Sequence, residues 1–140
     1  MVIKVFISHA STDTWVARQI AAHIERQSAS TFLDVASVAY GDDFEAEILK
    51  VEPDCTELLV LLTPWLLTRR WLWLEIGFFR HARKRIVCVL HGLSPESLRA
   101  NPNVASMLLK LDMVDINDLD SYLEQLRRRV AAAERRATNV

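Results

Sequence analysis

The sequence predicts a doubly wound α/β fold built on a parallel sheet, and two observations support this. Five short apolar runs, rich in Leu and β-branched residues, recur along the chain: Val2–Ile7, Thr31–Val35, Leu58–Thr63, Arg85–Leu90 and Leu111–Ile116. Runs that are continuous rather than alternating are typical of strands buried on both faces. Segments with helical spacing separate these runs, and such alternation indicates βαβ units.

Five helices are predicted between and after these strands. Helical stripes run over 14–26 (Trp15, Ile20, His23 and Ile24), over 43–51 and over 71–82. A fourth helix begins at Ser94, where Ser is a helix cap and Pro95 fits the first helical position. A last helix begins near Asn117. For five strands the commonest order is the flavodoxin-like 2-1-3-4-5, with helices on both faces of the sheet.

Length and composition indicate one soluble domain. The 140 residues fit a single domain over 1–137, with 138–140 as a tail or the start of a linker to a further domain. Two cysteines without a CxxC pair predict neither a disulfide framework nor a zinc site, and the four histidines lack metal-ligand spacing, so we expect no metal and no cofactor. The longest apolar stretch, 58–67, is too short to span a membrane, so we expect a cytoplasmic protein with no membrane partner.

Charge gives no indication of nucleic-acid binding. The net charge is −1, with −4 over residues 1–70 and +3 over residues 71–140. Nucleic-acid binding needs Lys and Arg gathered on one face and a high pI. The arginine-dense stretch Arg127–Arg129 lies on a helix with an acidic first turn, and complementation of the helix dipole explains it. We therefore expect no nucleic-acid partner.

The expected site lies where the strand order reverses, beyond the carboxyl ends of the 2–7 and 58–63 strands. A response-regulator receiver needs an acidic pair after its first strand, where this chain has Ser8 and His9, and an aspartate ending its third, where it has Thr63 and Pro64. No Gly precedes Gly41, and neither GxGxxG nor GxxxxGK occurs, which excludes the usual dinucleotide-binding and P-loop motifs.

Glu75 is the outstanding polar residue near this cleft. Trp71 and Glu75 are four residues apart, so their side chains share one helix face, with Phe79 one turn further on. A carboxylate in such an apolar segment is either solvated at the edge of the stripe, paired with Arg70 or Arg83, or placed there for chemistry. Its position directly beyond the 58–63 strand favours chemistry.

Three segments in order resemble a known family. Val5–Asp13 has an aromatic-aliphatic-Ser-His run followed by an acidic residue, and Phe32–Val35 is followed by a loop over 36–43 and then Phe44. Trp71–Glu75 has the form WxxxE. Together they resemble the Toll/interleukin-1 receptor (TIR) domain in its bacterial, NAD-cleaving form, over residues 2 to about 90. Two departures are Arg69, where the family often has Ser two residues before the Trp, and the absence of Pro from the 36–43 loop.

The resemblance implies a reaction and a set of site residues. Glu75 would be the catalytic carboxylate of an NAD+ hydrolase or ADP-ribosyl cyclase, with NAD+ as substrate. Nicotinamide leaves NAD+ as a neutral molecule, so the site needs only to stabilise an oxocarbenium-like ribosyl centre. The residues that would line the substrate site are Phe6, Ser8, His9, Asp34 and Trp71.

The resemblance also implies self-association with other TIR domains. The 36–43 BB loop of one copy would complete the site of its neighbour, through the assembly residues Tyr40, Gly41 and Phe44. Bacterial members act mostly in anti-phage immune signalling or as virulence factors. The apolar run that includes Trp65 and Trp73 belongs either to the core or to an assembly surface.

Three alternatives stay open. A non-catalytic TIR module could act by protein–protein association, as a scaffold or as a mimic of host adaptors. A nucleoside or nucleotide-base transferase on a related sheet is a weaker possibility. A flavin-phosphate loop is the weakest, and it would use the hydroxyl groups near the first strand: Ser8, Ser11, Thr12 and Thr14.

Overall fold

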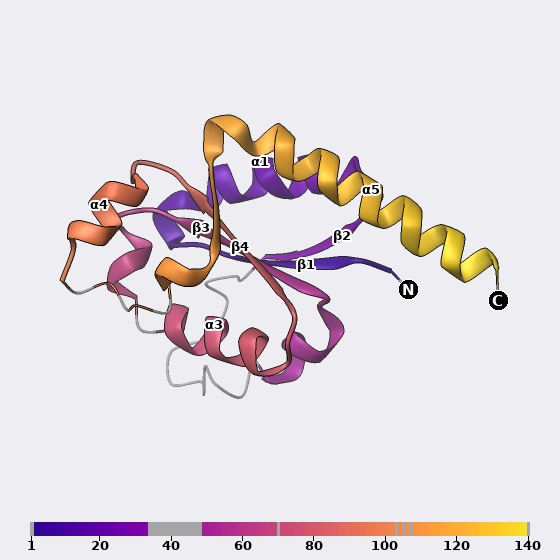
Figure 1. The fold of residues 1–140 in the computed structure, drawn as a ribbon, viewed down its shortest axis with the longest axis horizontal. Helices are drawn as coiled ribbons and strands as arrows, with labels where there is room; N and C mark the ends of the chain where they lie inside the picture. Colours follow the sequence, from indigo (N-terminus) through magenta and orange to yellow (C-terminus); the bar gives the residue numbers. More distant parts are fainter. Residues whose placement is uncertain are drawn as a thin grey trace.

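One parallel five-stranded sheet forms the centre of the molecule. The computed structural model describes residues 2–33, 49–69, 71–102, 104, 106 and 108–139. Its strands are β1 (Lys4–Ser8), β2 (Ser30–Leu33), β3 (Glu57–Leu62), β4 (Arg85–Leu90) and β5 (Asp112–Asp115). They lie in the order β2-β1-β3-β4-β5, and each neighbouring pair is parallel (Figure 1). The predicted flavodoxin-like 2-1-3-4-5 order is therefore confirmed.

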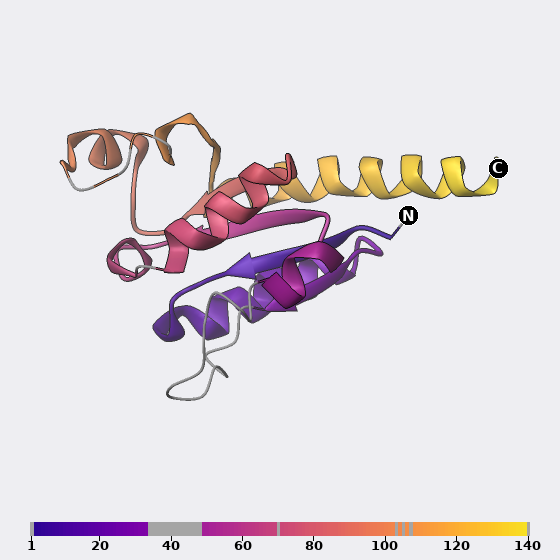
Figure 2. The same ribbon diagram turned by 90° about the horizontal axis from the view of Figure 1, so that it is seen from below.

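Helices cover both faces of this sheet. The helices are α1 (Thr14–Glu25), α3 (Trp71–His81), α4 (Pro95–Ala100) and α5 (Leu119–Thr138). Helices α1 and α5 lie on one face and α3 on the other, and both termini lie at the same end of the molecule (Figures 1 and 2). None of the helices in the described residues has both the length and the apolar character needed to cross a membrane.

Alternation along the strands sorts the core into two clusters. Val5 and Ile7 of β1 pack with the buried faces of α1 and α5, whereas Phe6 packs with the buried face of α3. Successive side chains of a strand point to opposite faces of the sheet. All six residues of β3 are buried, because helices cover this central strand on both faces. Full burial of each leucine there contributes roughly 1.5–3 kcal/mol.

Helix α1 corrects two expectations. Its buried residues are Ala17, Ile20, Ala21 and Ile24, whereas Trp15 is 71% exposed and His23 is also exposed. At 100° per residue Trp15 lies about 140° around the helix from Ile20, too far to share its face. In the first turn of α1 the residue on the buried face is Ala17, and not Trp15. The assignment of Trp15 and His23 to the buried stripe was wrong.

The other predicted helices agree with the structure where it describes them. Helix α3 begins at Trp71 as expected, and α4 follows Ser94, whose hydroxyl accepts a hydrogen bond from the backbone N–H of Ser97 at 3.1 Å. Residues 49–51 are helical, and the rest of the helix predicted over 43–51 lies outside the described residues.

Candidate functional site

Ser8 and His9 are buried at the carboxyl edge of the sheet. Ser8 ends β1, aligned with Val60 of β3, and both Ser8 and His9 are at most 5% exposed. Ser8 lies two residues after Phe6, so its side chain points to the same face of the sheet, the face that α3 covers. Within the described part of the chain, Ser8 Oγ and His9 Nδ1 have no hydrogen-bond partner.

Hydrogen bonds fix the start of α1 against the turn after β3. The Thr63 hydroxyl donates to Asp13 Oδ2 at 2.6 Å, which joins the end of β3 to the residue before α1. His9 Nε2 lies 3.4 Å from the Thr14 hydroxyl, which donates to the Ser11 carbonyl at 2.8 Å. The segments after β1 and β3 are therefore held together at the predicted reversal of strand order.

Glu75 occupies a position in the buried stripe of α3. The buried residues of this helix are Leu72, Glu75, Ile76 and Phe79, with the spacing i, i+3, i+4 and i+7 that defines one helix face. Glu75 has no exposed surface. The expectation of a solvated carboxylate at the edge of the stripe is therefore excluded, since Glu75 lies within the buried stripe.

Trp71 and Phe79 lie one helical turn before and one turn after Glu75, and Phe6 packs against Phe79. Trp71 is partly exposed and precedes Glu75 by one helical turn, so the two side chains share a face. Phe6 is 1% exposed, and its ring centroid lies 5.5 Å from that of Phe79 and 5.3 Å from that of Phe32. Phe6 therefore packs in the core between the sheet and α3.

Several predicted residues lie outside the described residues. These are Asp34, Arg70 and the assembly residues of the 36–43 loop and after it, namely Tyr40, Gly41 and Phe44. Of the described residues, Ser8 ends β1 on the face of the sheet that α3 covers, Trp71 and Glu75 lie in the first half of that helix, and His9 follows directly beyond β1.

A second buried carboxylate lies at the opposite end of the sheet, and the sequence analysis did not identify it. Glu57, at the start of β3, is 3% exposed and accepts a hydrogen bond from the Tyr122 hydroxyl at 2.8 Å. Arg129 donates to both carboxylate oxygens, through Nη1 to Oε2 and through Nη2 to Oε1 at 3.0 Å. Burial, followed by the Glu57 charge, raises the pKa of the Tyr122 hydroxyl. These contacts attach α5 to β3.

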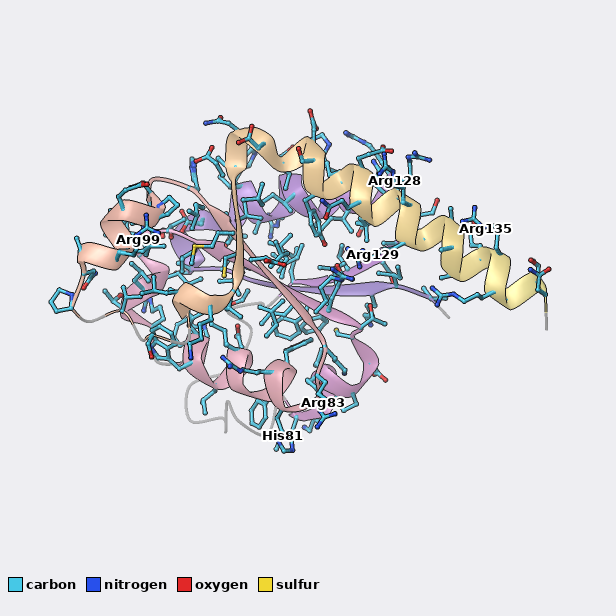
Figure 3. The ribbon with its side chains drawn as sticks, in the orientation of Figure 1. His81, Arg83, Arg99, Arg128, Arg129 and Arg135 are labelled. Carbon is cyan, nitrogen blue, oxygen red and sulfur yellow. The ribbon has the colours of Figure 1, made fainter. Side chains whose placement is uncertain are left out.

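The arginines of α5 therefore have different roles. Arg129 points toward the sheet and Arg128 away from it (Figure 3). Arg127 and Arg128 both pair with Glu124 on the helix surface. The helix-dipole explanation of this stretch was thus incomplete, because Arg129 neutralises a buried acid. Two features of the sequence could have indicated this contact. Glu57 directly precedes the apolar run over 58–63, and Tyr122 and Arg129 are seven residues apart and so share one face of the last helix.

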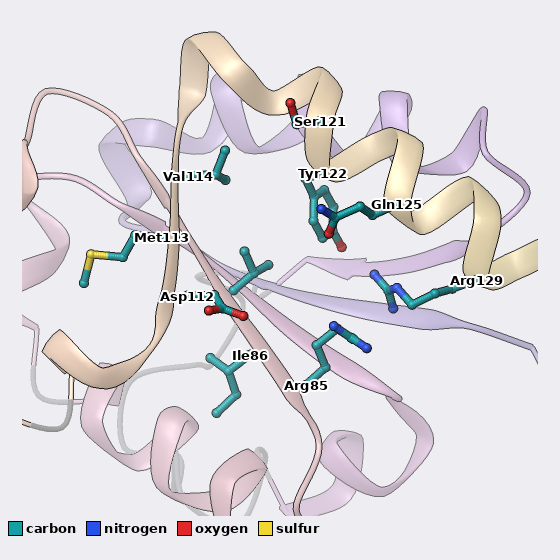
Figure 4. A pocket seen from close by; sticks show the side chains of 10 residues that line it. Arg85, Ile86, Asp112, Met113, Val114, Ser121, Tyr122, Gln125 and Arg129 are labelled. Atoms are coloured by element: carbon teal, nitrogen blue, oxygen red, sulfur yellow. The ribbon is translucent and has the colours of Figure 1, made fainter.

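Two cavities of the described chain lie away from Glu75. One of about 350 Å³ lies between β4, β5 and α5, with Arg85, Asp112, Gln125 and Arg129 in its wall (Figure 4). Another of about 340 Å³ lies beside the end of α3 and the start of β4. Neither cavity is lined by Ser8, His9 or Glu75. The candidate site is therefore indicated by the burial of these three polar side chains and not by a cavity.

Metal ligation and thiol chemistry receive no support from the described residues. No group of three or more His, Cys, Asp or Glu side chains there is arranged to hold a metal ion. Burial raises the pKa of the Cys55 thiol to about 11 and that of the Cys88 thiol to about 12. Both thiols are therefore protonated at neutral pH, and neither is an activated nucleophile.

Comparison with known proteins identifies the family. The TIR domain profile matches residues 5–130, so the chain belongs to the TIR domain family. A search of curated protein sequences finds no significant match.

Two solved structures share the fold. The TIR domain of the Toll-related receptor TRR-2 from Hydra magnipapillata has 20% sequence identity and a TM-score of 0.65, over 91% of this chain and 97% of that one. A metazoan TIR-STING receptor from C. gigas, solved in complex with 2′,3′-cGAMP, has 17% identity and a TM-score of 0.64. That match covers 90% of this chain and 38% of the receptor.

Proposed function

We propose that this TIR domain cleaves the bond between nicotinamide and ribose in NAD+, with Glu75 as the catalytic carboxylate. One observation supports this above the others: Glu75 is a carboxylate with no exposed surface inside the apolar stripe of α3. Burial of an ionisable group in such a stripe opposes folding unless other interactions compensate. Departures from the local rules of folding are expected at functional sites.

The chemistry requires little beyond this acid. As the C1′–N bond breaks, its electron pair leaves with nicotinamide, and positive charge develops on the ribosyl centre. A fixed carboxylate stabilises that charge most effectively where water is excluded. Water then attacks C1′, so NAD+ and water give ADP-ribose, nicotinamide and one proton. Attack by a group of the substrate itself would give a cyclic product instead.

The remaining site residues would shape the pocket for the ribose. Ser8 and His9 carry buried polar atoms without partners in the described part of the chain, and such atoms can bind the ribose hydroxyls. Trp71 would form one wall, and Phe6 would support the floor. Asp34 and a neighbouring copy's 36–43 loop, with Tyr40, Gly41 and Phe44, would complete the site in a cytoplasmic assembly, as in bacterial immune signalling.

The test is nicotinamide release from NAD+ by concentrated protein. We expect release by the wild-type protein and a fall of at least about a hundredfold in Glu75→Gln, in line with the loss of one electrostatic stabiliser in other enzymes. The control variant is Glu96→Gln on α4, whose exposed carboxylate contacts only Arg99 among the described residues. Unchanged release by Glu75→Gln would overturn the assignment.

A second candidate function is non-catalytic association through TIR–TIR contacts. It is favoured by large apolar side chains that are exposed in the isolated chain, above all Trp65, which is 62% exposed in the segment that leads into α3. Under this function, concentrated and crowded protein would assemble but release no nicotinamide.

A further inference from the structure

Arg69 is anchored directly before the helix that carries Glu75. It follows a short 3-10 turn over Leu66–Thr68, and its backbone N–H donates to the Leu66 carbonyl at 2.9 Å. Its own carbonyl accepts a hydrogen bond from the Leu72 N–H at 3.4 Å, in the first turn of α3. The backbone of Arg69 is therefore fixed on both sides.

The side chain of Arg69 is held against Trp71, and its charge has no partner among the described residues. The guanidinium carbon lies 5.4 Å from the centroid of the Trp71 ring, within the range of a cation–π contact. Its Nε atom is buried and has no hydrogen-bond partner within the described residues. Over the same residues Arg69 is in no ion pair. A buried donor with no acceptor is costly, and a bound anion would remove that cost.

The local field also favours an anion. The guanidinium stands beside the N-terminal end of α3, where the helix dipole adds partial positive charge. A guanidinium is planar and donates two parallel hydrogen bonds to a phosphate group. A phosphate also neutralises its charge, whereas a carboxamide or hydroxyl ligand does not.

The order of groups along α3 matches the order of groups in NAD+. The Trp71 ring lies next to the Arg69 guanidinium, and Glu75 follows Trp71 by one turn on the same face. In NAD+ the ribose that bears nicotinamide carries the diphosphate on its 5′ oxygen. With that ribose against Trp71 and its C1′ at Glu75, the diphosphate extends toward Arg69.

We propose that Arg69 binds the diphosphate of the dinucleotide and selects nucleotides over unphosphorylated nucleosides. This inference rests on the proposed function of Glu75. It assigns a binding role, not a catalytic one, because with C1′ placed at Glu75 the guanidinium would contact the diphosphate and not the bond that breaks.

The experiment compares Arg69→Met and Arg69→Lys with the wild type in NAD+ cleavage. Arg69→Met keeps an apolar stem against Trp71 but removes the charge, so we expect KM to rise about ten- to hundredfold while kcat changes less than about threefold. Arg69→Lys keeps the charge without the planar fork and should lie between the two. Inorganic pyrophosphate should compete with NAD+ in the wild type and about tenfold more weakly in Arg69→Met.

The control variant is Arg80→Met, which removes an exposed arginine from the far end of the same helix. Its KM should equal that of the wild type. An unchanged KM in Arg69→Met, or a loss confined to kcat, would overturn the inference and point to structural support of Trp71 alone. Thermal unfolding of each variant shows whether the fold is intact.

Failure of the proposed function is distinguishable from failure of this inference. If the wild type released no nicotinamide, calorimetric titration of NAD+ into the wild type and Arg69→Met would still decide the binding role. About tenfold weaker binding by Arg69→Met supports it. Equal affinity, or no binding by the wild type, overturns it.

Discussion

Cys88 lies in β4 with no exposed surface, and burial raises the pKa of its thiol to about 12 from an ordinary value near 9. Below pH 9 the folded and unfolded chains both keep this proton, so the thiol has no effect on the pH dependence of stability. Between pH 9 and 12 the unfolded chain loses the proton and the folded chain keeps it. The free energy of unfolding therefore falls with rising pH, by about 1.4 kcal/mol per pH unit from this group.

Urea denaturation at pH 8, 9 and 10 measures this slope. We expect Cys88→Ala to be less stable at pH 8, because of the volume it removes, and to lose less stability between pH 9 and 10 than the wild type. Burial also raises the pKa of Tyr122, which acts in the same direction above pH 10, so the comparison ends at pH 10. Parallel pH curves for the two proteins would contradict the prediction.

At the residue scale, the sequence was most informative where chemistry and position coincided. The shared helix face of Trp71 and Glu75, and the place of Ser8 at the end of a strand, could be predicted because helical spacing and strand ends determine those positions. Whether Glu75 was buried or solvated could not be predicted, because that depends on how α3 is rotated against the sheet. Trp15 shows the converse, since this aromatic residue was assigned to a buried stripe that alanine and isoleucine residues occupy.

At the scale of the element, α5 is attached to the central strand by a buried charge. Removal of Arg129 in Arg129→Met leaves the Glu57 carboxylate buried without its cation, although the Tyr122 hydroxyl still donates to it. Removal of one partner of a buried pair is strongly destabilising, and Arg129 is partly exposed, so we expect a loss of about 2–4 kcal/mol. Urea denaturation followed by circular dichroism measures it.

Two further variants separate this pair from ordinary surface charge. Arg128→Met removes an exposed arginine from the same turn of α5 and should change stability by less than about 0.5 kcal/mol. The double variant Glu57→Leu, Arg129→Met removes both charges and should recover most of the loss. A double variant as unstable as Arg129→Met alone would show that packing of the arginine stem, and not the buried charge, is responsible.

The strands were the elements best predicted by sequence. Runs such as 58–63 and 85–90 coincide with β3 and β4 to within a residue at each end, because a strand covered on both faces must be apolar throughout. The described part of β2, at the sheet edge, is Ser30–Leu33, and the last two residues of its predicted run lie outside the described residues. The signals for the link between Glu57 and α5 were present in the sequence, but their pairing could not be predicted, because they lie on two elements up to 72 positions apart.

At the scale of the whole molecule, the strand order followed from chain alternation and connection rules, whereas assembly depends on surfaces that a single sequence describes poorly. Trp65 lies two residues beyond Thr63, in the turn that Asp13 holds at the site edge, and it is 62% exposed. Trp15 is 71% exposed on α1. Both rings are accessible, but only Trp65 lies in the segment that leads into α3 and Glu75.

The activity of an assembled enzyme should therefore depend on Trp65. We expect Trp65→Ser to raise the protein concentration needed for half-maximal NAD+ cleavage per molecule by at least about tenfold, because a tryptophan at an interface centre commonly contributes 2 kcal/mol or more. Its thermal unfolding should match the wild type, since an exposed ring contributes little to the core. Trp15→Ser is the matched control and should leave the concentration dependence unchanged. Equal shifts of this concentration in both variants would show a general loss of nonspecific hydrophobic association. No shift in Trp65→Ser would place the contact between copies elsewhere on the domain.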